Sequence, residues 1–278
     1  MNGCGNDYIY VDNMDGQYSM LANPEQVAEL ARKLSDRSSG IGSDGLIILE
    51  SPSVPQTTLS MRMFNADGSE GKMCGNGIRC VAKLAYEKFG PKESYKIATL
   101  SGTRECFVTD ATKPDVFRVM VNMGRPSFLP ANIPVDFDDV MVMDEEFEVA
   151  DRTFRISCVS MGNPHCVIPV ENLEAFDVQK YGPLIERHTA FPEGVNVEFI
   201  EVKGNKVFQR TWERGSGETL ACGTGACAVG VCMILGRQIK SPVEVHLRGG
   251  VLKIEWDGLR EVWMTGDAVT EKTGTFEV

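Results

Sequence analysis

The sequence predicts an α+β protein built from two similar halves, in each of which strands wrap around a central apolar helix. The first observation is an internal repeat: a cysteine directly before Gly-x-Gly occurs at Cys74 and again 148 residues later at Cys222. Each cysteine opens an apolar run that is compatible with a helix, and short strand-like segments fill the rest of each half. With 278 residues and 42% hydrophobic content, the chain is long enough for one large or two small domains, and the repeat favours two.

Turn and periodicity signals predict the elements of the first half in order. Asn23-Pro24 supplies an N-cap and a first-turn proline for an amphipathic helix that extends to Arg37. The apolar residues after Cys74 predict a second helix, which Gly90-Pro91 ends. Residue types that favour strands occur at 8–12, 46–49, 59–64, 95–99, 105–109 and 117–122, with Ser101-Gly102 predicted as a hairpin turn.

The second half repeats this order. The turn Gly162-Asn163-Pro164 precedes a strand as the turn around Asn6 does, and at the offset of 148 residues Glu213 corresponds to Asn65. The helix after Cys222 is apolar on every side, so we expect it to be buried all round. Strands are predicted at 154–160, 166–170, 195–200, 206–212, 243–247, 252–256 and near 262–264, with a weak helix at 178–187.

Composition excludes several classes of function. A formal charge of −11 and a pI near 4.9 argue against binding to nucleic acid or to anionic membranes, and favour a small-molecule substrate. The longest apolar run, 225–236, is shorter than the roughly 18 residues that a membrane span needs. Without a basic-then-apolar leader, nine cysteines predict a reducing compartment, the cytoplasm. Their spacing does not fit a metal knuckle, so no metal is expected.

Two of the nine cysteines stand apart from the others. Cys74 and Cys222 each lie at a glycine-flanked helix start, where unpaired N–H groups and the helix dipole favour an anion. Such a position can lower a thiol pKa from about 8.5 to roughly 3.5–7.5, and the same N–H groups can hold a carboxylate. Cys4 is left open, and the remaining six are predicted to be core residues: Cys80, Cys106, Cys158, Cys166, Cys227 and Cys232.

Two such helix starts facing one carbon acid would support proton abstraction by one thiolate and reprotonation by the opposite thiol. This paired acid–base catalysis inverts a stereocentre, and each group typically contributes about 10²–10⁴-fold. A purely structural duplication is the alternative reading of the spacing. His165 and Glu213 favour catalysis, because either side chain could tune a nearby thiol, whereas isolated asparagines such as Asn65, Asn163 and Asn196 are often turn formers.

Seven motifs across the whole chain resemble the diaminopimelate epimerase family: "GCGNDY", "FNADGSE", "MCGNGIRC", "SMGNPHCV", "NVEF", "ERGSGETLACGTGAC" and "MTG". The resemblance implies an epimerase that needs neither pyridoxal phosphate nor another cofactor and that interconverts LL- and meso-diaminopimelate for lysine and peptidoglycan. It implies two similar domains, each a mixed, mostly antiparallel sheet curled around a central helix. Residues 1–121 and 267–278 form the first domain and 122–266 the second, with the site in the cleft between them. The resemblance is also compatible with a homodimer.

The resemblance also assigns roles to residues by motif. Cys74 and Cys222 are the acid–base thiols, and His165 and Glu213 adjust their pKa values. The helix starts at Gly75, Asn76, Gly223 and Thr224 hold the reacting carboxylate. The remaining amino and carboxylate groups are recognised by Asn6, Asn65, Asn163, Asn196, Glu213 and Arg214.

Three positions depart from the family pattern. Only Met1 and Asn2 precede "GCGN", so either the first strand is short or the start lies upstream; Gly45 replaces a common Gln and Thr224 a common Ser.

Two other functions stay open. One is a racemase of another amino acid, of the proline racemase type, although Arg214 and the asparagines favour a substrate with a second charged head. The other is a redox switch in which the two thiols form a reversible disulfide.

Overall fold

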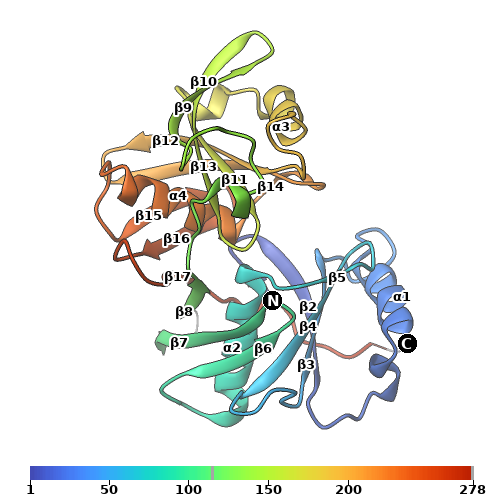
Figure 1. Ribbon diagram of the computed structural model, residues 1–278. Coiled ribbons are helices and arrows are strands. Elements are labelled where there is room, and N and C mark those ends of the chain that lie inside the picture. Colours follow the sequence, from blue (N-terminus) through green and yellow to red (C-terminus); the bar gives the residue numbers. More distant parts are fainter. Residues whose placement is uncertain (114–115, 277–278) are drawn as a thin grey trace. The chain divides into compact units, whose positions relative to one another are not determined.

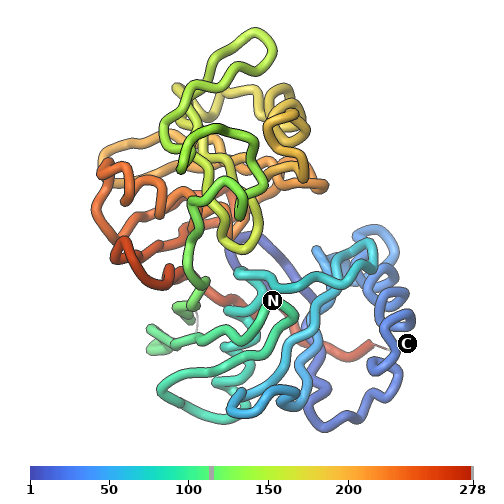
Figure 2. Tube along the Cα trace, viewed as in Figure 1, coloured from blue at the N-terminus to red at the C-terminus, as the bar shows by residue number. Residues whose placement is uncertain are grey.

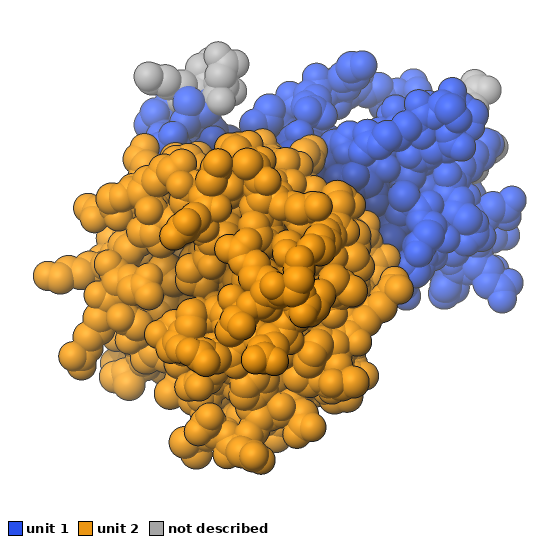
Figure 3. Space-filling view, turned by 90° about the horizontal axis from the view of Figure 1, so that it is seen from above, with its two compact units in different colours: residues 1–122, 265–278 blue, residues 123–264 orange. Residues whose placement is uncertain are grey.

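The computed structural model describes residues 1–113 and 116–276, and the chain divides into two compact units (Figure 1). Unit 1 comprises Met1–Asn122 and Thr265–Val278, and unit 2 comprises Met123–Met264, as the two colours of Figure 3 show. These limits lie within two residues of the predicted domain boundaries. The end of the chain returns to the start of unit 1 (Figure 2), where Asn2 and Val269 exchange two backbone hydrogen bonds of 2.8 Å.

The sheet of unit 1 is mixed. Its strands pair in the order β1-β2-β3-β4-β6-β7-β8, and β5 pairs with β4 next to β6. The pairs β2/β3 and β4/β6 are parallel, and each is joined by a helical crossover, as such pairs require. The strands are β1 Asn2–Gly3, β2 Asn6–Asn13, β3 Gly45–Glu50, β4 Leu59–Asn65, β5 Glu70–Gly71, β6 Tyr95–Thr99, β7 Gly102–Lys113 and β8 Val116–Gly124.

The sheet of unit 2 repeats this topology. Its order is β9-β10-β11-β12-β13-β15-β16, with β14 paired to β13. The pairs β11/β12 and β13/β15 are parallel, and each is again connected through a helix. The last strand, β17, pairs with β8 as the chain re-enters unit 1. The strands are β9 Met143–Val149, β10 Arg152–Ser160, β11 Pro164–Pro169, β12 Asn196–Lys203, β13 Lys206–Glu213, β14 Gly217–Thr219, β15 Val243–Leu247, β16 Gly250–Glu255 and β17 Val262–Asp267.

One helix in each unit is central. Helix α2 packs on β1, β2, β4, β6 and β7, and α4 packs on β10, β11, β12, β15 and β16, so each sheet curls around its helix (Figure 1). Helix α1 packs on β3 and β4, and helix α3 packs on β9, β12, β13 and β14. The predicted α+β fold with central helices is therefore confirmed. The helices are α1 Pro24–Ser35, α2 Gly75–Phe89, α3 Val178–Glu186 and α4 Gly223–Leu235, with 3-10 turns at Ser19–Ala22, Pro130–Asn132 and Leu173–Ala175.

Composition explains why α4 is buried on all sides and α1 on one. Ten of the thirteen residues of α4 are buried, and none is charged. Helix α1 instead buries Val27, Leu30, Ala31 and Leu34 against β3 and β4 and exposes its charged face. Its start follows the predicted signal, since the Asn23 side chain accepts hydrogen bonds from the first turn.

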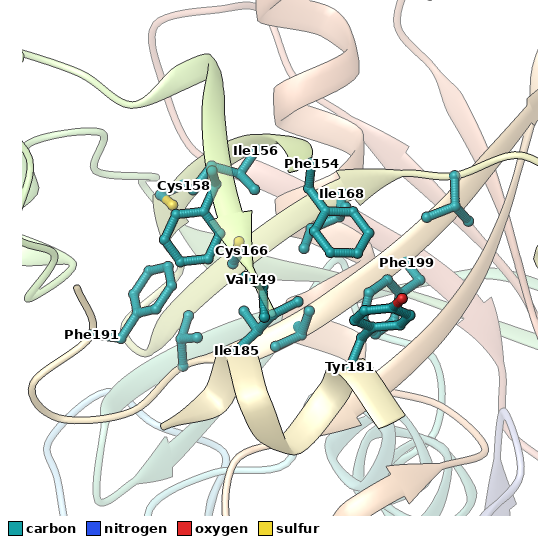
Figure 4. Close-up of a cluster of buried hydrophobic side chains, with 14 of the residues drawn as sticks. Val149, Phe154, Ile156, Cys158, Cys166, Ile168, Tyr181, Ile185, Phe191 and Phe199 are labelled. Atoms are coloured by element: carbon teal, nitrogen blue, oxygen red, sulfur yellow. The ribbon is translucent and has the colours of Figure 1, made fainter. Parts of the chain in front are cut away.

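A large hydrophobic cluster in unit 2, which contains several aromatic rings, includes buried residues of α3 (Figure 4). The rings of Phe176 and Tyr181 stack at 5.4 Å between centroids, and Phe154 meets Tyr181 edge-on at 5.2 Å. Burial of each such side chain contributes about 1.5–3 kcal/mol. The cluster fixes α3, and with it Glu186, whose contacts with the turn after β13 are described below.

Most predicted elements have the expected type, with ends shifted by a few residues. Residues 95–99 and 243–247 form strands with the predicted limits. The predicted Ser101-Gly102 turn is wrong by one residue, because Gly102 already pairs with Thr99 as the first residue of β7. Strand β9 was not predicted. Among the described residues, no helix is long and apolar enough to cross a membrane.

Candidate active site

Cys74 is the N-cap residue of α2. It has extended backbone angles (φ −124°, ψ 117°), and its sulfur accepts a hydrogen bond from Gly77 N at 3.3 Å. Gly77 lies close to Ile47, because a Cβ at Gly77 would be 2.6 Å from Ile47 Cδ1 and would force that side chain to shift. The cap thus places a half-buried thiol against the positive end of the helix.

Opposing effects act on the Cys74 thiol. Burial raises the pKa of Cys74, while N–H groups of Gly77 and Asn76, the Tyr8 hydroxyl and the positive charge of Arg79 lower it. Burial has the larger effect, so the expectation of a strongly acidic thiol is not met in the ligand-free protein. The donors are nevertheless in place to stabilise a thiolate when a substrate is bound.

A hydrogen-bond network extends from the first turn of α2. Arg79 is fully buried and donates to Gly75 O at 3.2 Å, to Asn76 Oδ1 at 3.0 Å and to Asp267 O at 3.1 Å. The Asn76 amide donates in turn to Asn6 Oδ1, and Asn6 donates to Asp44 Oδ2 at 3.2 Å. The side chain of Asn76 therefore braces the turn, which leaves its backbone N–H as the group that can meet a substrate.

Asn65 ends β4 at the turn that leads to Cys74. Its amide donates to Ser69 Oγ at 2.9 Å, and its backbone N–H donates to Ser69 O at 2.8 Å. These bonds fix the turn "NADGSE", to which Arg32 on α1 adds a hydrogen bond from Nη1 to Asp67 O at 3.2 Å.

Cys222 caps α4 in the same way. Its angles (φ −121°, ψ 112°) match those of Cys74, and its sulfur accepts from Gly225 N at 3.4 Å. It also lies 3.4 Å from the Thr224 hydroxyl. The side chain is 8% exposed, so this thiol is buried more deeply than Cys74.

The charged side chains near Cys222 are acidic, whereas the one near Cys74 is the cation Arg79. Burial raises the pKa of Cys222 well above its ordinary value, and the nearby carboxylates Glu213 and Glu198 raise it further. The Thr224 hydroxyl and Gly225 N–H lower it. Glu213 lies at the end of β13, where its Oε1 accepts from Thr219 Oγ1 at 2.7 Å.

A chain of hydrogen bonds connects Cys222 to a buried ionisable pair. Thr224 Oγ1 accepts from Asn163 Nδ2 at 3.3 Å, and Asn163 Oδ1 lies 3.0 Å from His165 Nε2. His165 Nδ1 lies 2.9 Å from Glu198 Oε1, and both side chains are fully buried. His165 is therefore not a solvent-facing turn residue.

Asn196 and Arg214 form a second set of contacts in unit 2. The Asn196 amide donates to Pro164 O at 2.8 Å and accepts from Arg214 N at 3.0 Å. Arg214 Nη1 donates to Glu193 O at 2.9 Å. Asn196 thus holds the backbone of Arg214 next to Glu213.

The predicted residues fall into two groups. Asn6, Asn65, Cys74, Gly75 and Asn76 belong to unit 1; the others belong to unit 2: Asn163, His165, Asn196, Glu213, Arg214, Cys222, Gly223 and Thr224.

Sequence reasoning missed the roles of Tyr8, Arg79 and Glu198 beside the thiols. The signal for Glu198 was a carboxylate in the middle of the apolar strand "NVEFI". The six other cysteines predicted as core residues are buried, and Cys4 is half-buried in a left-handed conformation (φ 59°). No group of three or more potential metal ligands occurs among the described residues.

A family model described as diaminopimelate epimerase matches residues 1–129 and 157–271. The chain belongs to the diaminopimelate epimerase family. It is 43% identical over 282 residues to the diaminopimelate epimerase of Leptospira biflexa, covering 100% of this chain and 98% of the relative. It is 45% identical to that of Geobacillus thermodenitrificans, covering 99% and 94%.

Solved structures of lower identity share the family's fold. A phenazine biosynthesis protein of the PhzF family from Bacillus anthracis matches with a TM-score of 0.64 at 16% identity, covering 96% of this chain and 92% of its own. A probable proline racemase from Agrobacterium radiobacter matches with a TM-score of 0.63 at 15% identity, covering 92% and 85%. Because these proteins carry different names, the fold alone does not decide the reaction.

Proposed function

We propose that this protein is a cofactor-independent epimerase that interconverts LL- and meso-2,6-diaminopimelate, on the route to lysine and peptidoglycan. One observation carries the proposal: in a chain of this family, Cys74 and Cys222 each cap a helix with a sulfur that accepts a backbone N–H. No other pair of cysteines in the described residues has this arrangement at two helix starts.

The chemistry follows from these caps. One thiolate removes the α-proton and the other thiol donates a proton to the opposite face of the same carbon, so the stereocentre inverts. The substrate carboxylate binds to the N–H groups at Gly75, Asn76, Gly223 and Thr224, which stabilise the negative charge that develops beside it. Each thiol is base in one direction and acid in the other.

Recognition of a second amino-acid head explains the remaining polar residues. Arg214 offers a guanidinium for a distal carboxylate, and Asn6, Asn65, Asn163 and Glu213 offer groups for the amino and carboxylate ends. Asn196 contributes by holding the Arg214 backbone. His165 and Glu213 adjust the thiols. A proline-type substrate has no second amino-acid end, so it would offer Arg214 no distal carboxylate to bind.

We also propose a reducing compartment, the cytoplasm, because all nine cysteines are free. A homodimer is proposed on the resemblance alone, and light scattering of the purified chain tests it. The absence of a cofactor is tested by assay after dialysis against a chelator and a carbonyl reagent, which should leave the rate unchanged.

Incubation with LL-diaminopimelate in deuterated water tests the reaction. The expected result is conversion to an LL and meso mixture with one solvent deuterium at the inverted α-carbon. L-Proline under the same conditions is the control and should not exchange. Exchange of proline or another amino acid without exchange of diaminopimelate would favour a racemase of that amino acid.

A further inference from the structure

Glu198 is a buried carboxylate for which the two-thiol reaction gives no direct task. It lies on β12 with a fully buried side chain, and its Oε2 has no hydrogen-bond partner among the described residues. Its Oε1 lies against the first turn of α4, because a Cβ added at Gly225 would be 2.4 Å from it. Burial of a carboxyl group without a compensating partner is costly, so its one contact, with His165, must carry the compensation.

The Asn163 amide turns its oxygen toward His165 Nε2 and its nitrogen toward Thr224 Oγ1, and this orientation assigns the His165 protons. The amide oxygen of Asn163 can only accept, so His165 Nε2, at 3.0 Å, carries a hydrogen. His165 Nδ1 lies 2.9 Å from Glu198 Oε1, so a second hydrogen lies between these two atoms. Whichever of the two atoms holds it, the pair has no net charge. This removes the cost of a lone carboxylate beneath α4.

The same logic gives the hydrogen bonds a direction. His165 Nε2 donates to Asn163 Oδ1, which turns the Asn163 amide hydrogens toward Thr224 Oγ1 at 3.3 Å. Since Thr224 Oγ1 accepts this hydrogen, its own hydrogen is free to donate to Cys222 Sγ at 3.4 Å. Every donor in this series of hydrogen bonds, from His165 to Thr224, therefore points toward the Cys222 sulfur.

We propose that Glu198 is a positioning residue that holds the His165 proton on Nε2 and thereby directs the Thr224 hydroxyl hydrogen to the Cys222 sulfur. With the Gly225 N–H, the sulfur then has two donors, which stabilise its thiolate when it acts as base. The role in turnover rests on the proposed function, whereas the placement of the protons does not.

Unit 1 shows that the cap itself does not need this carboxylate. Tyr8 pairs with Gly45 across β2 and β3 as His165 pairs with Asn196 across β11 and β12. Two residues further along, Ile47 lies against Gly77 where Glu198 lies against Gly225. The variant Glu198→Ile therefore introduces the residue that the other half already uses at this place.

Several titratable groups face this hydrogen-bond chain and enter the interpretation of any pH profile. They are His165 and Cys166 on β11, Glu198 on β12, Glu213 on β13, and Cys222 and Cys232 on α4.

Nitrogen-15 NMR of the histidine rings in the whole protein tests the proton placement directly. His165 is assigned by its loss in His165→Gln. We expect a protonated Nε2 from pH 6 to 9. An Nε2 without a proton, with the hydrogen on Nδ1 alone, would overturn the proposal, and this measurement needs no variant at Glu198 to fold.

Alkylation of Cys222 by iodoacetamide, followed by peptide mass spectrometry across pH, tests the effect on the thiol. In Glu198→Ile we expect alkylation of Cys222 to slow by about tenfold, the scale of one lost hydrogen bond to a charged group, with Cys74 unchanged. In Glu198→Gln the amide can donate to His165 Nδ1 and keep the proton on Nε2, so the rate should stay within about threefold. Glu201→Gln, a carboxylate on the same strand that accepts from Leu173 N at 3.1 Å, is the matched control and should not change the rate.

The sign of the effect separates this proposal from a simple charge effect. If Glu198 acted on Cys222 only by charge repulsion, Cys222 would be alkylated faster in both variants, and this result would overturn the proposal. An equal decrease of the alkylation rate in Glu198→Ile and Glu198→Gln would also overturn it. In turnover, Glu198→Ile should lower kcat by about tenfold with little change in KM, and Glu198→Gln should restore it. If wild type failed to exchange diaminopimelate while the NMR and alkylation results held, the proposed function would fail and this inference would stand.

Discussion

Cys74 and Cys222 have the same backbone setting and opposite electrostatic surroundings. Both cap a helix with nearly identical angles and accept an N–H three residues on. Beside Cys74 the charged neighbour is the cation Arg79, whereas beside Cys222 the first charged neighbour is the carboxylate Glu213, and Glu198 is paired with His165. The duplication has retained the helix cap and changed the charges around it.

The polar group that organises each thiol's network also comes from a different element. In unit 1 it is Arg79 on the helix, and the position 148 residues later is Cys227, a buried core residue. In unit 2 it is Glu198 on a strand, and the residue of unit 1 at the same place in the strand register is Ile47. The pKa of Cys222 is raised further than that of Cys74. We therefore expect the resting thiolate, where one is present, at Cys74.

Removal of either thiol gives the largest expected effect. Cys74→Ala and Cys222→Ala should each lower epimerisation by about 10³-fold, because each removes one of the two proton-transfer groups. The proton exchange that remains in each variant is informative. Each variant keeps one base, so each should exchange the α-proton of only one isomer in deuterated water, and the two variants should prefer opposite isomers.

Cys80→Ala is the matched control, since Cys80 is a buried core cysteine of the same helix. It should keep epimerisation within a few-fold. If epimerisation survived in either active-site variant, the two-thiol mechanism would be wrong.

Arg79 is the next test, because unit 2 has no cation at the same place. Arg79→Met leaves Gly75 O, Asn76 Oδ1 and Asp267 O without their donor, so we expect a loss of about 3 kcal/mol in the free energy of unfolding. Denaturant titration measures it. Arg79→Lys keeps the charge without the planar fork and should lose less. A stability equal to wild type in Arg79→Met would show that the network does not need the cation.

The charge difference should also appear as a difference in reactivity. Both thiol pKa values are raised, so the thiolate fraction and the alkylation rate of each should rise with pH through neutral and alkaline solution. Because Cys74 has the smaller shift and is less buried, we expect iodoacetamide to label it at least about tenfold faster than Cys222 near pH 8. Cys106, whose pKa burial raises to about 12, is the unreactive internal standard. Faster labelling of Cys222 would reverse the proposed order.

Local sequence signals were sufficient for the caps and for most strands. A cysteine before Gly-x-Gly and an apolar run predict both helix starts, and alternation predicts strands such as 243–247. Strand β9 was missed because three consecutive acidic residues, Asp144, Glu145 and Glu146, hide the alternation in burial that runs along the strand.

The charged partners of the thiols could not be predicted, because they depend on contacts between distant segments. Glu198 meets His165 across two parallel strands, 33 residues apart in the sequence. Arg79 meets Asp267 O, 188 residues away, only because the chain returns to unit 1. Register and topology decide these contacts, and neither follows from the spacing of the motifs.

The smallest expected effects concern the two outer helices, each of which holds the turn that leads to a thiol. Glu186 on α3 accepts from Gly215 N at 2.8 Å and from Trp212 Nε1 at 2.7 Å, and it is 8% exposed. Arg32 on α1 instead makes one exposed hydrogen bond to Asp67 O. Loss of a buried acceptor costs more than loss of an exposed donor, which water replaces.

Glu186→Gln should therefore lower the free energy of unfolding by about 1 kcal/mol, and Arg32→Ala by less than about 0.5 kcal/mol, both measured by denaturant titration. Since the Glu186 contact holds the backbone next to Glu213 and Arg214, Glu186→Gln should also raise KM for diaminopimelate, while Arg32→Ala leaves it unchanged. Equal effects of the two variants would mean that the turns before the two thiols are held equally, and the contrast between the halves would then be confined to the charges beside the sulfurs.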